Sequence, residues 1–198
     1  MKKNVLLITD SIISCNTLNK KQRCVNLLKR EIKKYKFRNI SKVGGTSSFV
    51  VKNFLKKIRG KKFQISILQI GLNDSYHFKS LKGKPQISKK IFKKNLINII
   101  LELKKVTLKK ILVLNYHKLL KNNLEINGKT INENLNIYNK IIEKISKKIR
   151  TVSFLNIAKL TSKILPKKIC RPFPDGVHLS AKGAKIYSKI LNRYLTNI

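Results

Sequence analysis

The segment NVLLITDSI, from Asn4 to Ile12, decides the fold of this chain. Its first six residues are almost continuously apolar and do not alternate with polar ones, which is typical of a strand buried on both faces. The run ends abruptly at Thr9-Asp10-Ser11. In sheets of such strands, ligands bind beyond the carboxyl ends, so this segment predicts both a strand and the place to look for chemistry.

Four more short apolar runs follow, and segments with helical periodicity separate them. The predicted strands are Asn4–Thr9, Asn39–Val43, Phe63–Ile70, Lys110–Asn115 and Thr151–Ile157. The predicted helices cover about 16–36, 47–58, 88–105, 130–149 and 180–195, and Ser180 is the expected N-cap of the last. This alternation predicts an α/β fold with a parallel sheet and helices on both faces.

Length and composition limit the class of protein. A chain of 198 residues with 42% hydrophobic residues is expected to form a single domain over residues 1–198. Its three cysteines form no C-x-x-C pair, which argues against a disulfide framework and a zinc site. The apolar run after the basic start is too short for a signal peptide, and no run is long enough to span a membrane. The sequence therefore predicts a cytoplasmic protein without a transmembrane segment, and it assigns no oligomeric state.

The net charge of +38 comes mainly from lysine, since only seven of the 46 basic residues are arginine. Specific nucleic-acid recognition relies on arginine for bidentate contacts and on aromatic residues for stacking. The lysines here are spread along the chain, mostly on the polar faces of helices. We interpret the charge as a solvated surface and expect no specific nucleic-acid partner.

Chemically useful residues cluster at the predicted strand ends. Ser11 follows the first strand, the Gly44-Gly45 pair follows the second and Asn73-Asp74 follows the third. Near the C-terminus, Asp175 precedes His178 by three residues, just before the last helix. A serine needs a base to take its proton, and a carboxylate that holds one nitrogen of an imidazole leaves the other free for that task.

These residues resemble the four motifs of the SGNH hydrolases, also called GDSL esterases and lipases. The corresponding stretches are ITDSI with Ser11, VGGTSS with Gly44 or Gly45, IGLND with Asn73, and DGVH with His178. The resemblance implies a flavodoxin-like three-layer α/β/α sandwich with five parallel strands. It also implies hydrolysis of a small-molecule or glycan ester through an acyl-enzyme, without a metal or other cofactor.

The resemblance further implies a role for each matching residue. Ser11 would be the nucleophile, His178 the general base and then acid, and Asp175 the residue that orients His178. The backbone N–H of Ser11, a glycine N–H and the Asn73 amide would form the oxyanion hole. Asp10 and Asp74 would support their loops by accepting backbone N–H bonds.

Several alternatives stay open from the sequence. Spacing favours Gly44 over Gly45 as the oxyanion donor without excluding either. Thr9 stands where the family usually has glycine, so a shifted turn could weaken catalysis. The other functions considered are an acyltransferase on sugar or cell-envelope intermediates, a degenerate scaffold that binds anionic partners and, less favoured, a flavin or nucleotide binder.

Some neighbouring features receive no catalytic role. His77 and His117 are expected to be solvent-facing loop residues, and a place in the lining of the substrate cleft is the less favoured alternative for each. Cys15 and Cys24 are expected to be small core residues. The long loops 71–87 and 116–129 are expected to determine the substrate.

Overall fold

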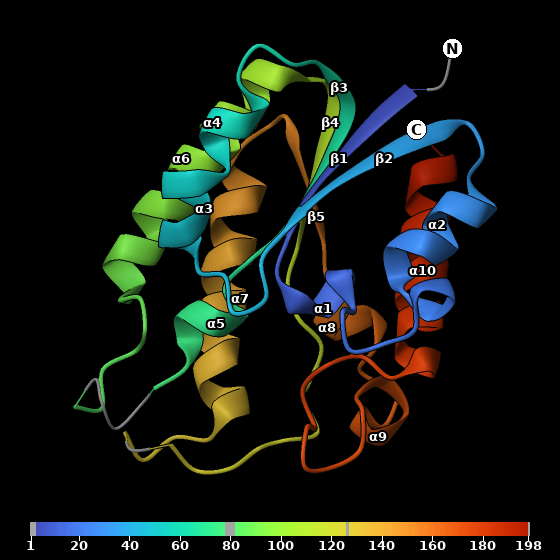
Figure 1. Cartoon of the computed structure of the whole chain (residues 1–198). Coiled ribbons are helices and arrows are strands. Elements are labelled where there is room, and N and C mark those ends of the chain that lie inside the picture. Colours follow the sequence, from blue (N-terminus) through green and yellow to red (C-terminus); the bar gives the residue numbers. More distant parts are fainter. Residues whose placement is uncertain (1–2, 78–81, 126, 198) are drawn as a thin grey trace.

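The computed structural model describes residues 3–77, 82–125 and 127–197, and its centre is one parallel sheet of five strands. The strands lie in the order β2-β1-β3-β4-β5, the order of flavodoxin-like folds (Figure 1). They are β1 (Lys3–Thr9), β2 (Tyr35–Ser41), β3 (Phe63–Gln69), β4 (Thr107–Leu114) and β5 (Val152–Leu155). The predicted flavodoxin-like parallel sheet is thereby confirmed.

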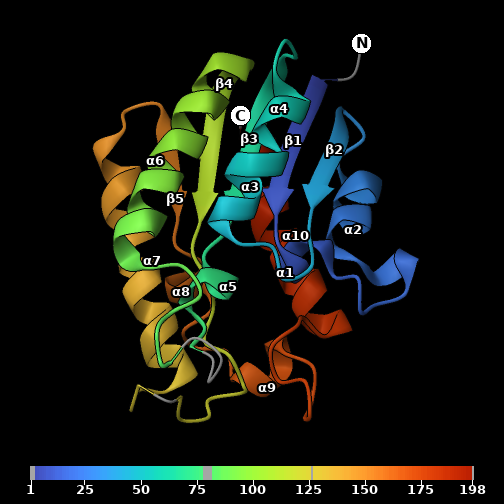
Figure 2. The same cartoon turned by 60° about the vertical axis from the view of Figure 1, so that its left-hand side comes forward.

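Helices cover both faces of the sheet. They are α1 (Ser11–Ser14), η1 (Lys20–Gln22), α2 (Cys24–Glu31), α3 (Ser47–Asn53), α4 (Leu55–Ile58), α5 (Leu72–Ser75), α6 (Lys89–Val106), α7 (Ile131–Lys148), α8 (Ile157–Leu160), α9 (Pro166–Ile169) and α10 (Ala181–Thr196). Figures 1 and 2 show α3, α4, α6 and α7 on one face and α2 and α10 on the other. The short helices α1, α5, α8 and α9 gather at the carboxyl edge of the sheet, so the layers are α/β/α.

The middle of the sheet is fully buried, as its apolar runs predict. Val5 to Ile8 in β1 and Ile67 to Leu68 in β3 have no exposed surface. Strands sandwiched between two helical layers need apolar side chains on both faces, and this need explains why the runs do not alternate.

Several predicted boundaries differ from the structure by up to three residues, and two predicted elements were wrong by more. The second strand is not Asn39–Val43 but Tyr35–Ser41, at the edge of the sheet. Its exposed Lys36 and Arg38 alternate with buried Tyr35 and Phe37, so the strand lacks the continuous apolar run of the central strands.

The single helix predicted over about 16–36 was also wrong. The chain instead forms the one-turn α1, the short η1 and then α2, which begins only at Cys24. Cys15 closes α1 in the left-handed conformation, with φ of 49°, and this conformation stops the helix.

The two long loops lie at the carboxyl edge and contact each other. The backbone N–H of His77 donates to the Glu125 carboxylate at 2.9 Å. Residues 78–81 of the predicted loop 71–87 and residue 126 of loop 116–129 lie outside the described residues. Within the described part of the chain, no helix has the length and apolarity needed to cross a membrane.

The start of α10 is fixed by close backbone packing. Ser180 caps the helix as predicted, because its Oγ accepts from the Gly183 N–H at 3.0 Å. A Cβ at Gly183 would lie 2.0 Å from the carbonyl oxygen of Ile169 in α9. The position therefore requires glycine for contact with a neighbouring backbone, although glycine is a poor helix former.

We predict that Gly183→Ala destabilises the fold. The added methyl group must push α9 and α10 apart, which costs about 2 kcal/mol, so the melting temperature should fall by about 5 °C. Thermal unfolding measures the change, with Lys185→Ala on the exposed side of α10 as the matched control. Equal melting temperatures for the two variants would contradict the close contact.

Candidate active site

Ser11 lies on the turn that follows β1. Asp10 is the N-cap of α1 and accepts from the Ile12 N–H at 2.9 Å, so the chain turns sharply after the strand. As the first helical residue, Ser11 has a backbone N–H without a partner inside the helix. The turn therefore presents the Ser11 hydroxyl and a backbone donor at the carboxyl edge of the sheet.

Three side chains form a continuous chain of hydrogen bonds. Ser11 Oγ lies 3.1 Å from His178 Nε2, and His178 Nδ1 lies 3.1 and 3.0 Å from the two carboxylate oxygens of Asp175. Ser11 and His178 are 167 positions apart in sequence. These distances allow proton transfer from the serine to the imidazole.

The segment that carries His178 is held by backbone contacts. The His178 carbonyl accepts from the Arg171 N–H at 2.7 Å, next to an antiparallel bridge between Cys170 and Leu179. Asp175 also accepts the backbone N–H groups of Val177 and His178, at 3.0 and 2.9 Å. Burial alone would raise the pKa of Asp175, but these bonds and the His178 ring hold that pKa below its usual value.

The two glycines after β2 differ in what their backbone does. Gly44 has a φ of +67° and lines the cavity around Ser11. The N–H of Gly45 instead donates to the Lys42 carbonyl at 3.0 Å. Asn73 lines the same cavity, and its Nδ2 donates to the Gly45 carbonyl at 3.1 Å. Gly44 and Asn73 therefore line one cavity with Ser11, from the ends of two other strands.

Asp10 is buried beneath this surface. Besides capping α1, its carboxylate accepts from the Tyr116 hydroxyl, just beyond β4, at 2.6 Å. Burial raises its pKa to about 6, although the bonds from Tyr116 and Ile12 oppose that rise.

Asp74 is the second buried acid. It accepts from the Ser47 N–H at 3.0 Å and from the Ser47 hydroxyl at 2.5 Å. Burial raises its pKa to about 6, against the effect of the Ser47 bonds. Asp74 thus ties the loop after β3 to the start of α3, which follows the glycine pair.

Thr9 does not displace the turn. It is the last residue of β1, paired with Ser41 and Gln69, and is not among the residues with positive φ. The hydrogen bond between Ser11 and His178 forms with threonine present.

His77 and His117 are not the solvent-facing residues that we expected. The His77 side chain is 9% exposed and lies 3.4 Å from Glu125. His117 is fully buried, with Nδ1 2.7 Å from the Tyr187 hydroxyl. Burial lowers the pKa of His117 to about 4. His77 lies against Glu125 of the loop before α7, and His117 packs against Tyr187 of α10, so each is covered by a segment distant in sequence. Cys15 and Cys24 are buried, as predicted.

Sequence reasoning missed three residues that shape the site. They are Ser47 and Tyr116, the partners of the buried acids, and Lys121, which lines the cavity beside Ser11. A serine just past a glycine pair and a tyrosine at a strand end were weak signals for two of them. Lys121 gave none, because it is one lysine among many.

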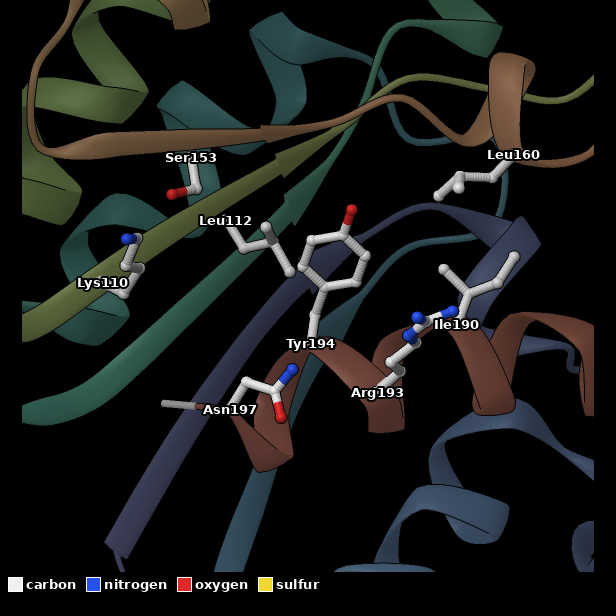
Figure 3. A pocket seen from close by; sticks show the side chains of 8 residues that line it. All are labelled: Lys110, Leu112, Ser153, Leu160, Ile190, Arg193, Tyr194 and Asn197. Atoms are coloured by element: carbon white, nitrogen blue, oxygen red, sulfur yellow. The ribbon is translucent and has the colours of Figure 1, made fainter.

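The cavity around Ser11 has a volume of about 530 Å³. A larger cavity, of about 640 Å³, lies between α10 and strands β4 and β5 (Figure 3). No histidine is among its lining residues, which are Lys110, Leu112, Ser153, Leu160, Ile190, Arg193, Tyr194 and Asn197. It therefore lacks a base for a serine nucleophile and is not the candidate active site.

The described residues contain no group of three or more His, Cys, Asp or Glu side chains that could hold a metal ion.

The sequence matches the model of the family GDSL-like Lipase/Acylhydrolase over residues 18–191. Ser11 precedes the matched segment, whereas Asn73 and His178 lie within it. No curated protein is detectably similar in sequence to the chain.

Solved structures share the fold at low sequence identity. A lipase/acylhydrolase from Enterococcus faecalis has a TM-score of 0.78 and 16% identity, with 98% of this chain and 96% of that chain covered. Axe2, an acetylxylan esterase from Geobacillus stearothermophilus, has a TM-score of 0.71 and 18% identity, with coverage of 96% and 93%. A member of the lipolytic protein G-D-S-L family from Veillonella parvula has a TM-score of 0.72 and 12% identity, with 98% of this chain and 99% of that chain covered.

We predict that the buried Asp74 makes wild-type stability fall as pH rises. Its folded pKa of about 6 lies above the ordinary aspartate pKa of 3.8, so the folded state holds the proton more tightly than the unfolded state. The contribution of Asp74 to the free energy of unfolding is fully present below pH 3.8 and is lost as pH rises through about 6. The loss is about 1 to 3 kcal/mol.

Urea denaturation of wild type and Asp74→Asn at pH 4 and pH 7 measures this effect. Asparagine keeps an oxygen that can accept the Ser47 N–H bond, and Asp10 is present in both proteins. The free energy of unfolding of wild type minus that of Asp74→Asn should therefore be smaller at pH 7 than at pH 4. A difference that does not change with pH would contradict the prediction.

Proposed function

The chain belongs to the GDSL-like lipase/acylhydrolase family and is a carboxylic ester hydrolase, and we propose that it works through an acyl-enzyme on Ser11. The observation that carries this proposal is the unbroken hydrogen-bond chain from Ser11 through His178 to Asp175. We propose small-molecule or glycan esters as its substrates, because a cavity of about 530 Å³ accommodates groups of that size.

In the first half of the reaction, His178 Nε2 takes the proton of the Ser11 hydroxyl while Oγ attacks the ester carbonyl. Asp175 holds the Nδ1 side of the ring and stabilises the imidazolium that forms. The tetrahedral intermediate then collapses, and the alcohol leaves with the proton from His178. The acyl group stays bonded to Ser11 Oγ.

In the second half, water replaces the alcohol. His178 takes a proton from the water as its oxygen attacks the acyl carbonyl, and the same proton returns to Ser11 Oγ as the carboxylic acid departs. No metal is needed for either half, because the serine, the imidazole and the carboxylate supply the nucleophile, the base and the orienting group.

The oxyanion formed in each half needs donors. We assign them to the backbone N–H groups of Ser11 and Gly44 and to Nδ2 of Asn73. Gly44 is preferred to Gly45 because the Gly45 N–H already donates to Lys42. Nδ2 of Asn73 has two hydrogens, so its bond to the Gly45 carbonyl aims the amide and leaves one hydrogen for the oxyanion.

Labelling with a fluorophosphonate probe tests the activated serine. Wild type should be labelled, and Ser11→Ala and His178→Ala should not, with a loss of ester hydrolysis of at least about 10⁴-fold. Ser14→Ala is the matched control, because Ser14 is a buried serine in the same turn whose hydroxyl has no hydrogen-bond partner among the residues that the structure describes. A folded wild type that is not labelled, or labelling that survives in Ser11→Ala, would overturn the mechanism.

A second prediction concerns Asn73. Removing one oxyanion donor should lower kcat by about 10²-fold and leave KM nearly unchanged, because the bond strengthens only in the transition state. Steady-state kinetics of Asn73→Ala measures the effect. Asn53→Ala, at the end of α3, is the control, since the Asn53 amide donates to the Phe49 carbonyl away from the cavity. A higher KM with unchanged kcat would instead assign Asn73 to ground-state binding.

A further inference from the structure

We propose that Lys121 makes this enzyme selective for esters that carry an anionic group, such as a carboxylate, sulfate or phosphate. The inference rests on the hydrolase function proposed for Ser11. Lys121 lines the same cavity as Ser11 and His178, and among the residues that the structure describes it is the only lysine or arginine that does so. It belongs to the loop between β4 and α7, far in sequence from both.

The backbone of Lys121 is fixed against the turn that carries the base. Its N–H donates to the Gly176 carbonyl at 2.8 Å. Gly176 has a φ of +63°, and a Cβ there would lie 2.9 Å from both Cβ and N of Lys121. This glycine permits the loop to approach the segment between Asp175 and His178. The lysine is therefore part of the site, and its side chain is half-buried.

The charge of Lys121 is not neutralised by the protein. Among the described residues, no ion pair includes it. Asp175, the one acid that lines the cavity, is occupied by the His178 ring at 3.0 Å and by Arg171 at 3.5 Å. Glu125, on the same loop, accepts from the His77 N–H and from the Asn134 amide. A lysine that lines the cavity and has no carboxylate partner among the described residues leaves a binding position for an anion from outside.

The other residues that line the cavity indicate which uncharged part of the ester it can hold. Val43, Leu72, Pro174 and Val177 give the cavity an apolar lining around the Ser11 hydroxyl. A compact ester with an apolar body and one negative group matches this combination. The negative group can belong to the acyl part or to the alcohol part, because Lys121 gives the same charge-assisted hydrogen bond to either.

Two pairs of synthetic esters separate these sources. The acyl-side pair is mono-para-nitrophenyl succinate and its neutral methyl ester, which share one leaving group. The alcohol-side pair is the acetate of meta-hydroxybenzenesulfonate and the acetate of the neutral meta-hydroxybenzenesulfonamide. The quantity measured is the ratio of kcat/KM for the anionic ester to kcat/KM for its neutral partner.

Wild type should prefer the anionic ester in at least one pair, and the pair that shows the preference identifies the source. Lys121→Met keeps most of the side-chain length and loses the charge, so the ratio should fall roughly five- to tenfold. Lys121→Arg should retain the ratio. Lys118→Met is the matched control, because Lys118 is an exposed lysine on the same loop that does not line this cavity.

Two results would overturn the proposal. One is a wild-type enzyme that hydrolyses the neutral esters but prefers the anionic ester in neither pair. The other is a preference that persists in Lys121→Met, since the overall charge of +38 would then explain it. Hydrolysis of the neutral esters that disappears in Ser11→Ala shows that the proposed function holds in either case. Absence of Ser11-dependent hydrolysis of all four esters would instead overturn both proposals.

Discussion

Every functional side chain of this protein depends on one constraint, which is that all five strands run in the same direction. Parallel strands release the chain at a single edge of the sheet, so loops that are distant in sequence meet there. β1 lies between β2 and β3. The loop after β1 leads towards β2, and the chain later returns on the other side of β1 to form β3. The loops after β1 and β3 therefore diverge, and Ser11 and Asn73, which follow these two strands, line one cavity at this edge.

Topology brings the loops to this edge, but buried hydrogen bonds hold them in register. Asp10 joins the end of β1 to Tyr116 beyond β4, and Asp74 joins the end of β3 to Ser47 at the start of α3. Both carboxyl groups lie in surroundings that disfavour their charge, as their raised pKa values show. Each nevertheless accepts a backbone N–H at a helix start, which would otherwise be buried without a partner. Burial of these carboxyl groups thus lowers the stability of the fold, and their hydrogen bonds fix the positions of Ser11 and the glycine pair.

The sequence predicted the features that depend on local pattern and failed where packing decides. The central strands were predictable because burial on both faces leaves continuous apolar runs. The edge strand β2 was misplaced because its one covered face gives only an alternation over Tyr35 to Arg38. Ser11, Asn73 and His178 were recognisable because short motifs follow strands or precede a helix. The choice between Gly44 and Gly45 needed the carbonyl of Lys42, which local sequence does not reveal.

Charge provides the clearest contrast between composition and structure. The chain has only eight acidic residues against 46 lysines and arginines, yet each acid has a specific bond. Within the described part of the chain, two of them pair with lysine on a helix surface, and these are Glu102 and Glu143. The other six bind backbone groups, neutral side chains, histidine or arginine, and these are Asp10, Glu31, Asp74, Glu125, Glu133 and Asp175. Most lysines therefore cannot be neutralised within the chain, and the repulsion among them opposes folding. What distinguishes Lys121 is consequently not its lack of a carboxylate, which it shares with most lysines, but its place in the cavity beside Ser11, the proposed nucleophile.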